Sequence, residues 1–464
     1  MNLLDQTIEY FAPQWQLKRA KARHMLGLNS RNFEAASKGR RTENWKTTKN
    51  FSDPSTVLHT IVDRSRYLAA NNAYAKRGLN AIPSHVVRRG ITPNISSNRR
   101  FEKAFRSWAA STKCDFEGRC TFYGLQWLAM KTIAESGEVL IRKRLGDQGN
   151  QDIPLKLQVL EPDFLDTNKP GTKKGIEYSE DGQRLAYWVY REDPRTMRRV
   201  DSVRIPADEI IHAFELLRPG QQRGLPWLTP VIIRLKDLDD YEDAQLVRQK
   251  IASCLVGVIH DMEMDEPAGK MKDEDWSTFT PGSWEILPPG KTVTFNNPPV
   301  LQGYGEYLSA MLHGIASGLQ VPYEVLTSDY EKVNFSSSRM AFLEFYKTVE
   351  HWQEHIMVSQ ICNPIFNWAT ELAAFGGISP GTATVNWGLP KREYVDPIKE
   401  IKAQIMSIRA GLTTLAAEIR KSGEDPDELL EEYAALLQTL DSKRITLDSD
   451  PRVKETNDTK EQSD

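Results

Sequence analysis

The chain of 464 residues has few cysteines and no long apolar run. Four scattered cysteines are too few for a disulfide framework, and they predict reduced thiols in a protein made in a cytoplasm. They are Cys114, Cys120, Cys254 and Cys362. The best unbroken apolar run, Cys254–Ile259, is far shorter than the roughly 20 residues that a membrane helix needs. We therefore expect a soluble protein without a membrane partner.

We also expect no signal peptide, because Asp5 and Glu9 interrupt the region where its apolar segment would lie. A large excess of charge of one sign is missing too. The formal net charge of -3 argues against a protein that simply coats nucleic acid. Charge is nevertheless uneven, since the N-terminal arm is basic and the segment around Glu424–Glu432 is acidic. Such blocks are usually solvated faces or tails and less often partner contacts.

Most catalytic motifs are absent. No G-x-S-x-G serine elbow occurs anywhere in the chain. Gly290-Lys291-Thr292 looks like the end of a phosphate-binding loop, but Glu285 stands where that loop needs a glycine. The following "TVTF" is typical of a strand, whereas the loop requires a helix whose N-terminus faces the phosphate. We reject this motif.

The segment His351-Trp352-Gln353-Glu354-His355 matches H-x-x-E-H, the inverted zinc-peptidase signature. Two histidines one helical turn apart can share a zinc ion, with the glutamate as general base and a distant acid as third ligand. Glu371 or Glu393 would have to be that ligand. A pattern with two free positions arises often by chance, so the favoured interpretation is a polar helix face beside packing aromatics. We expect no metal and no cofactor.

Two further clusters do not fit a metal site. The acidic segment "HDMEMDE" at His260–Glu266 lacks the turn glycine of a calcium loop, so a solvated loop is the better interpretation. Cys114 and Cys120 lack the CxxC spacing of zinc or redox pairs, and no second pair exists.

Periodicity predicts a mixed first half of the chain. Residues 55–87, 101–110 and 124–136 carry apolar side chains at three- and four-residue spacings, which predicts helices. Between Glu138 and Phe214 the period changes to two, with breaks at Gly, Asp, Asn and Pro. This pattern predicts an antiparallel β region that ends in the loop "RPGQQRGLP".

A helix predicted from about Thr229 to Ser253 has two apolar rows where an ordinary surface helix has one. At 100° per residue, one row holds Val231, Leu235, Leu238 and Leu246. The row almost opposite holds Ile233, Ala244, Val247 and Ile251. Two rows indicate a helix held from both sides, either within a core or between neighbouring copies in a ring.

The rest of the chain is mainly helical by pattern. A β-rich insert precedes a helix over Tyr304–Gly318, a polar loop over Thr327–Ser338 and a long helix from about Ser337. Pro364 should kink or break that helix. A short strand within "GISPGTATVNWGLP" and helices over 397–410, 414–421 and 427–440 follow, and the polar composition beyond Asp441 predicts a disordered tail. The fold class expected from the residues is α+β, mainly helical.

The order of several strings resembles the lambda family of tailed-phage portal proteins over the chain up to about Leu440. These strings begin with the RSR…NN…A run at Arg64–Ala73, "ESGEVLIRKR" at Glu135 and "LEPDFLDT" at Leu160. "RGLPWLTPVIIRLKDLDDYEDAQLVRQKIAS" from Arg223 is the most specific. "EILPPGKTVTFNNPP", "IASGLQVPYEVLTSDYEKVNFSSSRMAFLEF" and "IRAGLTTLAAEIRKSGEDPDEL" follow in the family's order.

The resemblance implies a portal-type fold with a wing, a helical stem, a small α/β clip, a tunnel loop and helix, and a helical crown. The implied boundaries are 1–225 for the wing, 226–252 and 302–320 for the stem helices, 253–301 for the clip, 321–338 for the tunnel loop region, 339–372 for the tunnel helix, 373–440 for the crown and 441–464 for the tail.

The resemblance also implies a function: a non-enzymatic ring, usually a dodecamer, at one capsid vertex of a virion assembled in a bacterial host. Double-stranded DNA would pass through it, without sequence specificity, during packaging and ejection. Terminase large subunit, capsid and scaffold proteins, and head–tail connector proteins would be its partners. In the loop, the candidates for DNA contact are Tyr330, Lys332, Asn334 and Arg339, with Lys347 after them. In the clip, the candidates for partner docking are Asp261, Glu263, Asp265 and Glu266.

Two alternatives stay open from the residues alone. One is a zinc metallopeptidase that uses the HWQEH motif. The other is a helical adaptor that binds partner proteins without any channel.

Overall fold

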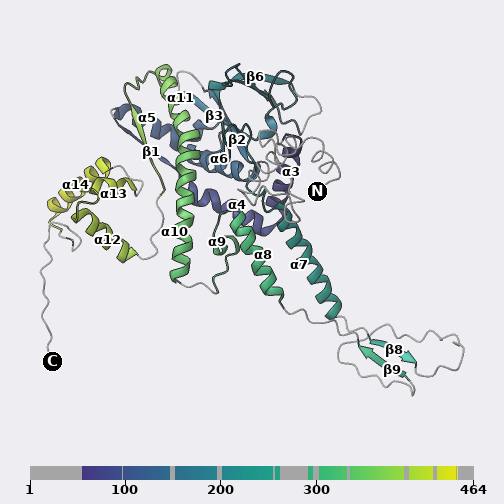
Figure 1. Cartoon of the computed structure of the whole chain (residues 1–464). Coiled ribbons are helices and arrows are strands. Elements are labelled where there is room, and N and C mark those ends of the chain that lie inside the picture. Colours follow the sequence, from purple (N-terminus) through teal and green to yellow (C-terminus); the bar gives the residue numbers. More distant parts are fainter. Residues whose placement is uncertain are drawn as a thin grey trace, which may run out of the picture. The chain divides into compact units, whose positions relative to one another are not determined.

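The computed structural model describes residues 55–96, 98–146, 152–195, 201–253, 257–261, 291–295, 303–331, 335–390, 397–421, 426–445 and 447. The chain divides into two units, residues 1–54 and 55–464, and all the described residues belong to the second. Within that unit the protein is mainly helical with small antiparallel sheets (Figure 1). The expected class, α+β and mainly helical, is confirmed.

The helices predicted at the start of the described region are present. They are α3 (Ser55–Asn71), α4 (Ala73–Val86), α5 (Arg99–Ala110) and α6 (Phe122–Ser136). Local capping explains several of their ends: Asn72, Asn98 and Thr121 each accept a backbone N–H of the first turn that follows. Gly137 ends α6 with φ 93°, a left-handed conformation that favours glycine.

The predicted β region forms two three-stranded antiparallel sheets. One has the order β3-β2-β7 and the other the order β4-β5-β6. The strands are β2 (Glu138–Leu145), β3 (Leu155–Leu160), β4 (Ile176–Tyr178), β5 (Arg184–Tyr190), β6 (Ser202–Pro206) and β7 (Ile210–Phe214). The sequence pattern missed β4, which is three residues long.

Strand β2 belongs to two cores at once. Val139 and Ile141 lie in the main hydrophobic core, which the helices share, whereas Leu140 lies in a smaller core with the β4-β5-β6 sheet. Alternate side chains of a strand point to opposite faces of its sheet, so β2 joins the two cores. This explains why "EVLI" reads as a continuous apolar run instead of an alternating one.

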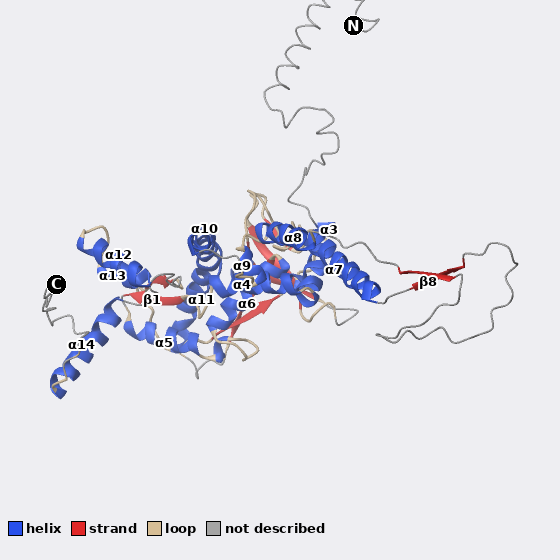
Figure 2. Cartoon of the chain, turned by 90° about the horizontal axis from the view of Figure 1, so that it is seen from below, coloured by secondary structure: helices blue, strands red, loops and turns tan. Residues whose placement is uncertain are grey.

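Two helices follow, α7 (Ile232–Ser253) and α8 (Tyr304–Gly318), and they lie side by side in both views (Figures 1 and 2). Between them the structure describes one antiparallel pair, β8 (Gly257–Asp261) with β9 (Lys291–Phe295). The strand at Lys291–Phe295 confirms that the Gly290-Lys291-Thr292 segment is not followed by the helix of a phosphate-binding loop. His260 and Asp261 are the last residues of β8, so the interpretation of these two as part of a loop was wrong.

The predicted long helix begins at Phe335, slightly before the expected Ser337. Of the expected kink or break at Pro364, the break does not occur. Helical backbone runs from α10 (Phe335–Trp352) through a π-helical segment, η5 (Gln353–Cys362), into α11 (Asn363–Ala373). Pro364 follows directly after this π-helical segment. The departure from α-helical geometry lies in the residues before the proline, where the missing N–H leaves a carbonyl without its donor.

The last described elements are a strand and three helices. They are β10 (Thr384–Gly388), α12 (Pro397–Arg409), α13 (Leu415–Lys421) and α14 (Pro426–Lys443). β10 pairs with β1 (Thr92–Ser96), which the sequence pattern did not predict. Because α14 continues to Lys443, the disordered tail predicted from residue 441 begins too early, and residues 448–464 lie outside the described part of the chain.

Candidate functional site

A buried ion pair fixes the loop that leads into α7. Glu138, the first residue of β2, accepts a hydrogen bond from Arg223 Nε at 2.6 Å and one from the backbone N–H of Gly224 at 2.7 Å. His212 Nε2, from β7, lies 2.9 Å from Glu138 Oε2, the carboxylate oxygen that also accepts from Gly224. The three side chains are 1–5% exposed. A buried carboxylate needs such a set of donors, because its ionised form is otherwise costly to desolvate.

The charges of this cluster follow from its geometry. Burial alone would raise the pKa of Glu138, but the adjacent Arg223 and His212 outweigh it and hold the pKa at about 2. Burial lowers the pKa of His212 despite its carboxylate neighbour. Glu138 is therefore ionised and can only accept, so the neutral His212 ring donates its Nε2–H to the carboxylate.

Close backbone packing holds the same loop against the end of α6. A Cβ on Gly224 would lie 2.1 Å from the carbonyl oxygen of Gly137, and a Cβ on Gly137 would lie 2.5 Å from the backbone of Leu225. Trp227 N–H donates to the carbonyl of Ala134 at 3.0 Å, and its ring packs on Trp352 with 4.5 Å between centroids. The string "RGLPW" thus positions the start of α7 on the body of the protein.

The two apolar rows predicted for α7 are present, and they differ in burial. Val231, Leu235 and Leu238 are at most 2% exposed and belong to the main core. Ile233 and Val247, from the opposite row, are 72% and 53% exposed. Leu246 belongs to the first row by sequence but is 52% exposed. Among the described residues, Leu238 is the last member of that row that lies in the main core.

Small residues bring α8 close to α7. A Cβ on Gly318 would lie 2.3 Å from Val231 Cγ1, and one on Gly314 would overlap the guanidinium of Arg234. Farther along the pair, Tyr241 of α7 contacts Tyr304 and Tyr307 of α8, with ring centroids 5.9 and 4.6 Å away. The two helices therefore form one packed unit.

The acidic residues of α7 have different surroundings. Asp239 accepts a hydrogen bond from Asn72 Nδ2 at 2.6 Å, which ties α7 to the junction of α3 and α4. Asp240 pairs with Lys236 on the exposed side of the helix. Burial and the neighbouring Asp239 and Asp243 raise the pKa of Glu242. Asp239 thus has a structural contact, whereas Asp240 faces solvent.

The loop predicted at Thr327–Ser338 is shorter in the structure. Thr327 is the last residue of α9 (Tyr323–Thr327), and α10 already begins at Phe335. Tyr330 is 58% exposed, and Lys332 and Asn334 lie outside the described residues. Arg339 is paired instead with Glu400 of α12, with 3.9 Å between Nη2 and Oε1. Lys347 lies on α10 and pairs with Glu344 at 2.8 Å.

Of the acids proposed for partner docking, Asp261 ends β8 opposite Lys291 of β9. Glu263, Asp265 and Glu266 lie outside the described residues.

The HWQEH motif spans the junction between α10 and η5. The rings of His351 and His355 lie 4.6 Å apart on the surface, but Trp352 and Gln353 are buried packing residues. Glu371, one possible third ligand, pairs with Lys143 at 2.6 Å, and Glu393 lies outside the described residues. Among the side chains that the structure describes, no group of three His, Cys, Asp or Glu could hold a metal ion.

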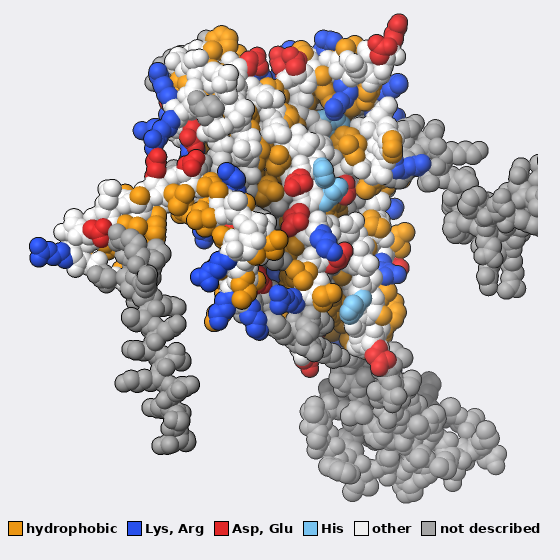
Figure 3. All heavy atoms as spheres, turned by 60° about the vertical axis from the view of Figure 1, so that its left-hand side comes forward, with side chains coloured by type: hydrophobic (Ala, Val, Ile, Leu, Met, Phe, Trp, Pro, Cys, Tyr) orange, Lys and Arg blue, Asp and Glu red, His pale blue; other side chains and the backbone are white. Residues whose placement is uncertain are grey.

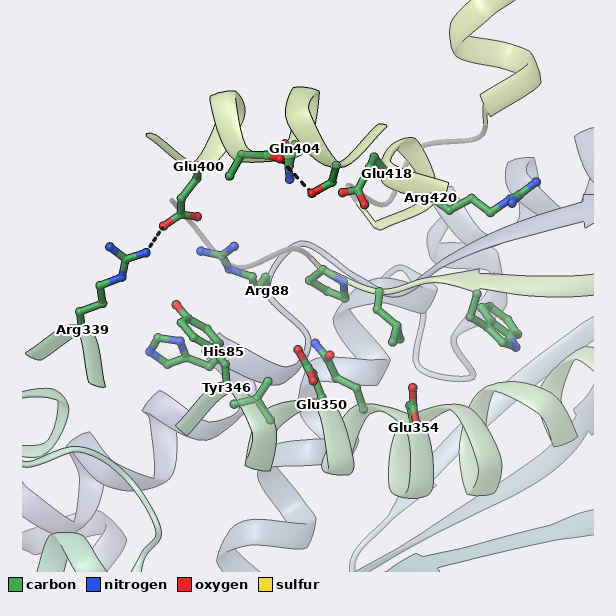
Figure 4. Close-up of a pocket in the computed structure, with 17 residues that line it drawn as sticks. His85, Arg88, Arg339, Tyr346, Glu350, Glu354, Glu400, Gln404, Glu418 and Arg420 are labelled. Atoms are coloured by element: carbon green, nitrogen blue, oxygen red, sulfur yellow. Dashed lines mark hydrogen bonds and ion pairs between the residues drawn. The ribbon is translucent and has the colours of Figure 1, made fainter. Parts of the chain in front are cut away.

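A polar cavity of about 800 Å³ lies between α10 and the helices α12 and α13. Figure 4 shows Glu350 of α10 and Glu354 of η5 on one side and Glu400, Gln404 and Glu418 on the other. Arg88 lies between them and Arg339 points toward Glu400, so the charges in the cavity are mixed. On the face drawn in Figure 3, acidic, basic and apolar side chains are likewise interspersed.

Sequence reasoning missed Glu138, Arg223 and His212 as a cluster. The available signal was a glutamate and an arginine within otherwise apolar, glycine-flanked strings, "SGEVLI" and "RGLPW". Charged residues in such strings are rarely buried unless they are paired.

The described part of the chain is thus a helical pair fixed to an α+β body, with an exposed apolar row on α7. No described helix is long and apolar enough to cross a membrane. A sequence model of the phage portal protein, lambda family, matches residues 38–353. The chain belongs to this family of portal proteins, which gives it a structural and not an enzymatic role.

Individual relatives agree with the family match. The probable portal protein of Halomonas phage phiHAP-1 is 27% identical over 446 residues, covering 86% of this chain and 85% of the relative. Portal protein B of Escherichia phage lambda is 21% identical over 432 residues, covering 79% and 81%. The neck of a native GTA particle, computed with C12 symmetry, has a similar fold with a TM-score of 0.52 at 12% identity. That match covers 78% of this chain and 94% of the other.

Proposed function

We propose that copies of the chain form a closed ring at one capsid vertex, and that its bore conducts double-stranded DNA during packaging and ejection. The observation that carries this proposal is the exposed row of Ile233 and Val247 on α7, opposite a row that is already buried in the same subunit. A head-to-tail contact repeated by rotation closes into a ring. The C12 symmetry of the similar neck supports twelve copies.

The regions of the ring follow the boundaries expected from the sequence. The wing would comprise residues up to 225, the stem would comprise α7 and α8, and the clip would contain β8 and β9. The tunnel loop would lie before α10, and α12 to α14 would form the crown.

A conduit has to guide a polyanion without holding it, because strong neutralisation of phosphates gives tight binding. The net charge of -3 and the mixed charges of the described surface support this role. Tyr330, Lys332, Asn334 and Arg339 would contact phosphates or sugars without reading sequence. Arg339 would then exchange its pairing with Glu400 for DNA.

Terminase large subunit would dock at the clip during packaging, where Asp261, Glu263, Asp265 and Glu266 would supply a charged surface. Head–tail connector proteins would bind the ring after packaging, and capsid and scaffold proteins would surround it at the vertex. The protein would be synthesised in the cytoplasm of the bacterial host and become part of the virion.

Negative-stain imaging of the purified protein tests the ring. We expect annular particles for the wild type and mostly monomers for the double variant Ile233→Asp, Val247→Asp, because burying two carboxylates at each contact opposes association. Leu185→Asp, on a β5 side chain that is 49% exposed, is the matched control and should leave rings intact. A wild type that stays monomeric at every concentration would contradict the proposal.

The variant Lys332→Glu distinguishes a DNA conduit from an adaptor that has no channel. We expect this variant to form normal rings and to lower the amount of packaged DNA in an infection complementation assay. If rings of the Lys332→Glu variant package DNA normally, Lys332 does not contact the DNA.

A further inference from the structure

The helix α12 carries an apolar row that the described part of its own subunit leaves largely exposed. Ile398, Ile401 and Ile405 are 69%, 46% and 44% exposed, and the half-buried Ile408 continues the row. Spacings of three and four residues place these side chains on one face of the helix. Among the described side chains of residues 397–445, only Ile419 and Pro426 are buried, so these helices have almost no core of their own.

The subunit contacts α12 through a different face. Glu400, Gln404 and Ser407 line the polar cavity against α10, and Glu400 reaches Arg339 across it (Figure 4). At 100° per residue these positions lie roughly a third of a turn away from the isoleucine row. Within the described residues, the body of the protein therefore contacts α12 by its polar side and leaves most of the apolar row exposed.

A second helix of the same region has a matching pattern. On α14, Leu429, Tyr433 and Leu436 are 38%, 40% and 49% exposed, again at spacings of four and three. Apolar rows with this alternation are the pattern by which helices pack as coiled coils.

The charges beside the two rows are opposite. Lys402 and Arg409 follow the apolar positions 401 and 408 on α12, whereas Glu432 precedes Tyr433 on α14. Glu431 lies on the far side of α14, where it pairs with Arg99 of the same chain. Charges that flank an apolar row set which helices pair and how they are oriented. One helix thus offers a basic-edged row and the other an acidic-edged row.

We propose that α12 of one subunit packs against α14 of the next copy, with the isoleucine row on the leucine–tyrosine row and Lys402 near Glu432. The two faces differ, so the contact is head-to-tail, as a ring requires. This inference rests on the proposed ring and adds to it a second contact, separate from the exposed row of α7.

Cross-linking with isotope labels tests this contact directly. Rings assembled from a mixture of ¹⁵N-labelled and unlabelled chains are treated with a carbodiimide, which joins lysines to carboxylates, and the products are mapped by mass spectrometry. We expect cross-links between Lys402 and Glu432 that join a labelled peptide to an unlabelled one. Rings in which α12 and α14 are linked only within one chain, or not at all, overturn the inference and leave the ring itself standing.

Charge reversal gives an independent readout on the full chain. Lys402→Glu and Glu432→Lys should each lower the association constant about fivefold per contact, and the double variant should restore it. Lys402→Arg keeps the charge and is the matched control. Native mass spectrometry at increasing salt measures ring dissociation, and single reversals that behave like the wild type would contradict the pairing.

Discussion

Arg223 Nε lies 2.6 Å from Glu138 Oε1, and this ion pair joins the start of a strand to the loop before α7 in surroundings that exclude solvent. Glu138 also holds Gly224 N–H and the ring of His212. Helix α7 therefore takes its direction from a buried charge cluster as well as from apolar packing. Removing the charge of Glu138 or of Arg223 should leave the other charge uncompensated in the core.

Glu138→Gln tests this cluster with almost no change of shape. We expect it to lower the free energy of unfolding by about 3–5 kcal/mol, because Arg223 stays buried without its counter-charge. Urea unfolding followed by tryptophan fluorescence measures the effect. Glu177→Gln is the control: its partner Arg204 lies 2.8 Å away at a more exposed site, where the loss should be about 0–1 kcal/mol. Equal losses for the two variants would contradict the role of burial.

The same cluster predicts acid sensitivity in two steps. Burial lowers the pKa of His212 below its usual 6.5, so the unfolded chain binds this proton first and stability falls as pH drops below about 6.5. Glu138 has a pKa of about 2 instead of the usual 4.5, and its contribution to stability is present above pH 4.5 and lost as pH falls toward 2.

Urea midpoints measured between pH 8 and pH 3 check both steps. His212→Asn should remove the decline that begins below about pH 6.5 and keep the later one. A variant that retains the full first step would assign it to another group.

The α7–α8 contact predicts a contrast between two glycines. Gly318→Ala should destabilise the protein by about 1–3 kcal/mol, because the new Cβ would meet Val231, which is β-branched and buried. Gly314→Ala should be tolerated, since the guanidinium end of Arg234 can move and alanine favours a helix by about 1 kcal/mol. Thermal unfolding of the two variants side by side makes the comparison. The reverse order of stability would mean that α7 and α8 are spaced differently from the structure.

The sequence allowed the helices to be predicted well because their signal is local. The apolar rows of α7, the bounds Tyr304–Gly318 of α8 and the alternating strands all follow from side-chain periodicity within one element. The isoleucine row of α12 has the same local signal, but its burial depends on neighbours. Periodicity alone therefore could not distinguish a covered row from an exposed one.

The missed features depend on contacts between distant residues. Glu138 lies 74 residues from His212 and 85 from Arg223, and β1 pairs with a strand almost 300 residues away. No local pattern marks such partners. At Pro364 a local rule predicted a kink or a break. The helix is not broken: the backbone stays helical through Pro364, between Ile361 and Ile365 that are each 1% exposed, and it is π-helical just before the proline.

The thiols provide a final prediction, since the chain was expected to contain reduced cysteines. Cys114, Cys120 and Cys362 are free in the structure, and the first and last of these are fully buried. Burial raises the pKa of the Cys114 thiol to about 12 and raises that of Cys362 as well, so neither forms a reactive thiolate near neutral pH.

Iodoacetamide at pH 8 should therefore label Cys120, which is half-buried, and leave Cys114 and Cys362 unmodified until urea is added. Peptide mapping by mass spectrometry before and after unfolding gives the comparison for each site. Rapid labelling of Cys362 in the native protein would mean that the core around η5 and α6, where Gln126 lies 3.7 Å from its sulfur, opens readily.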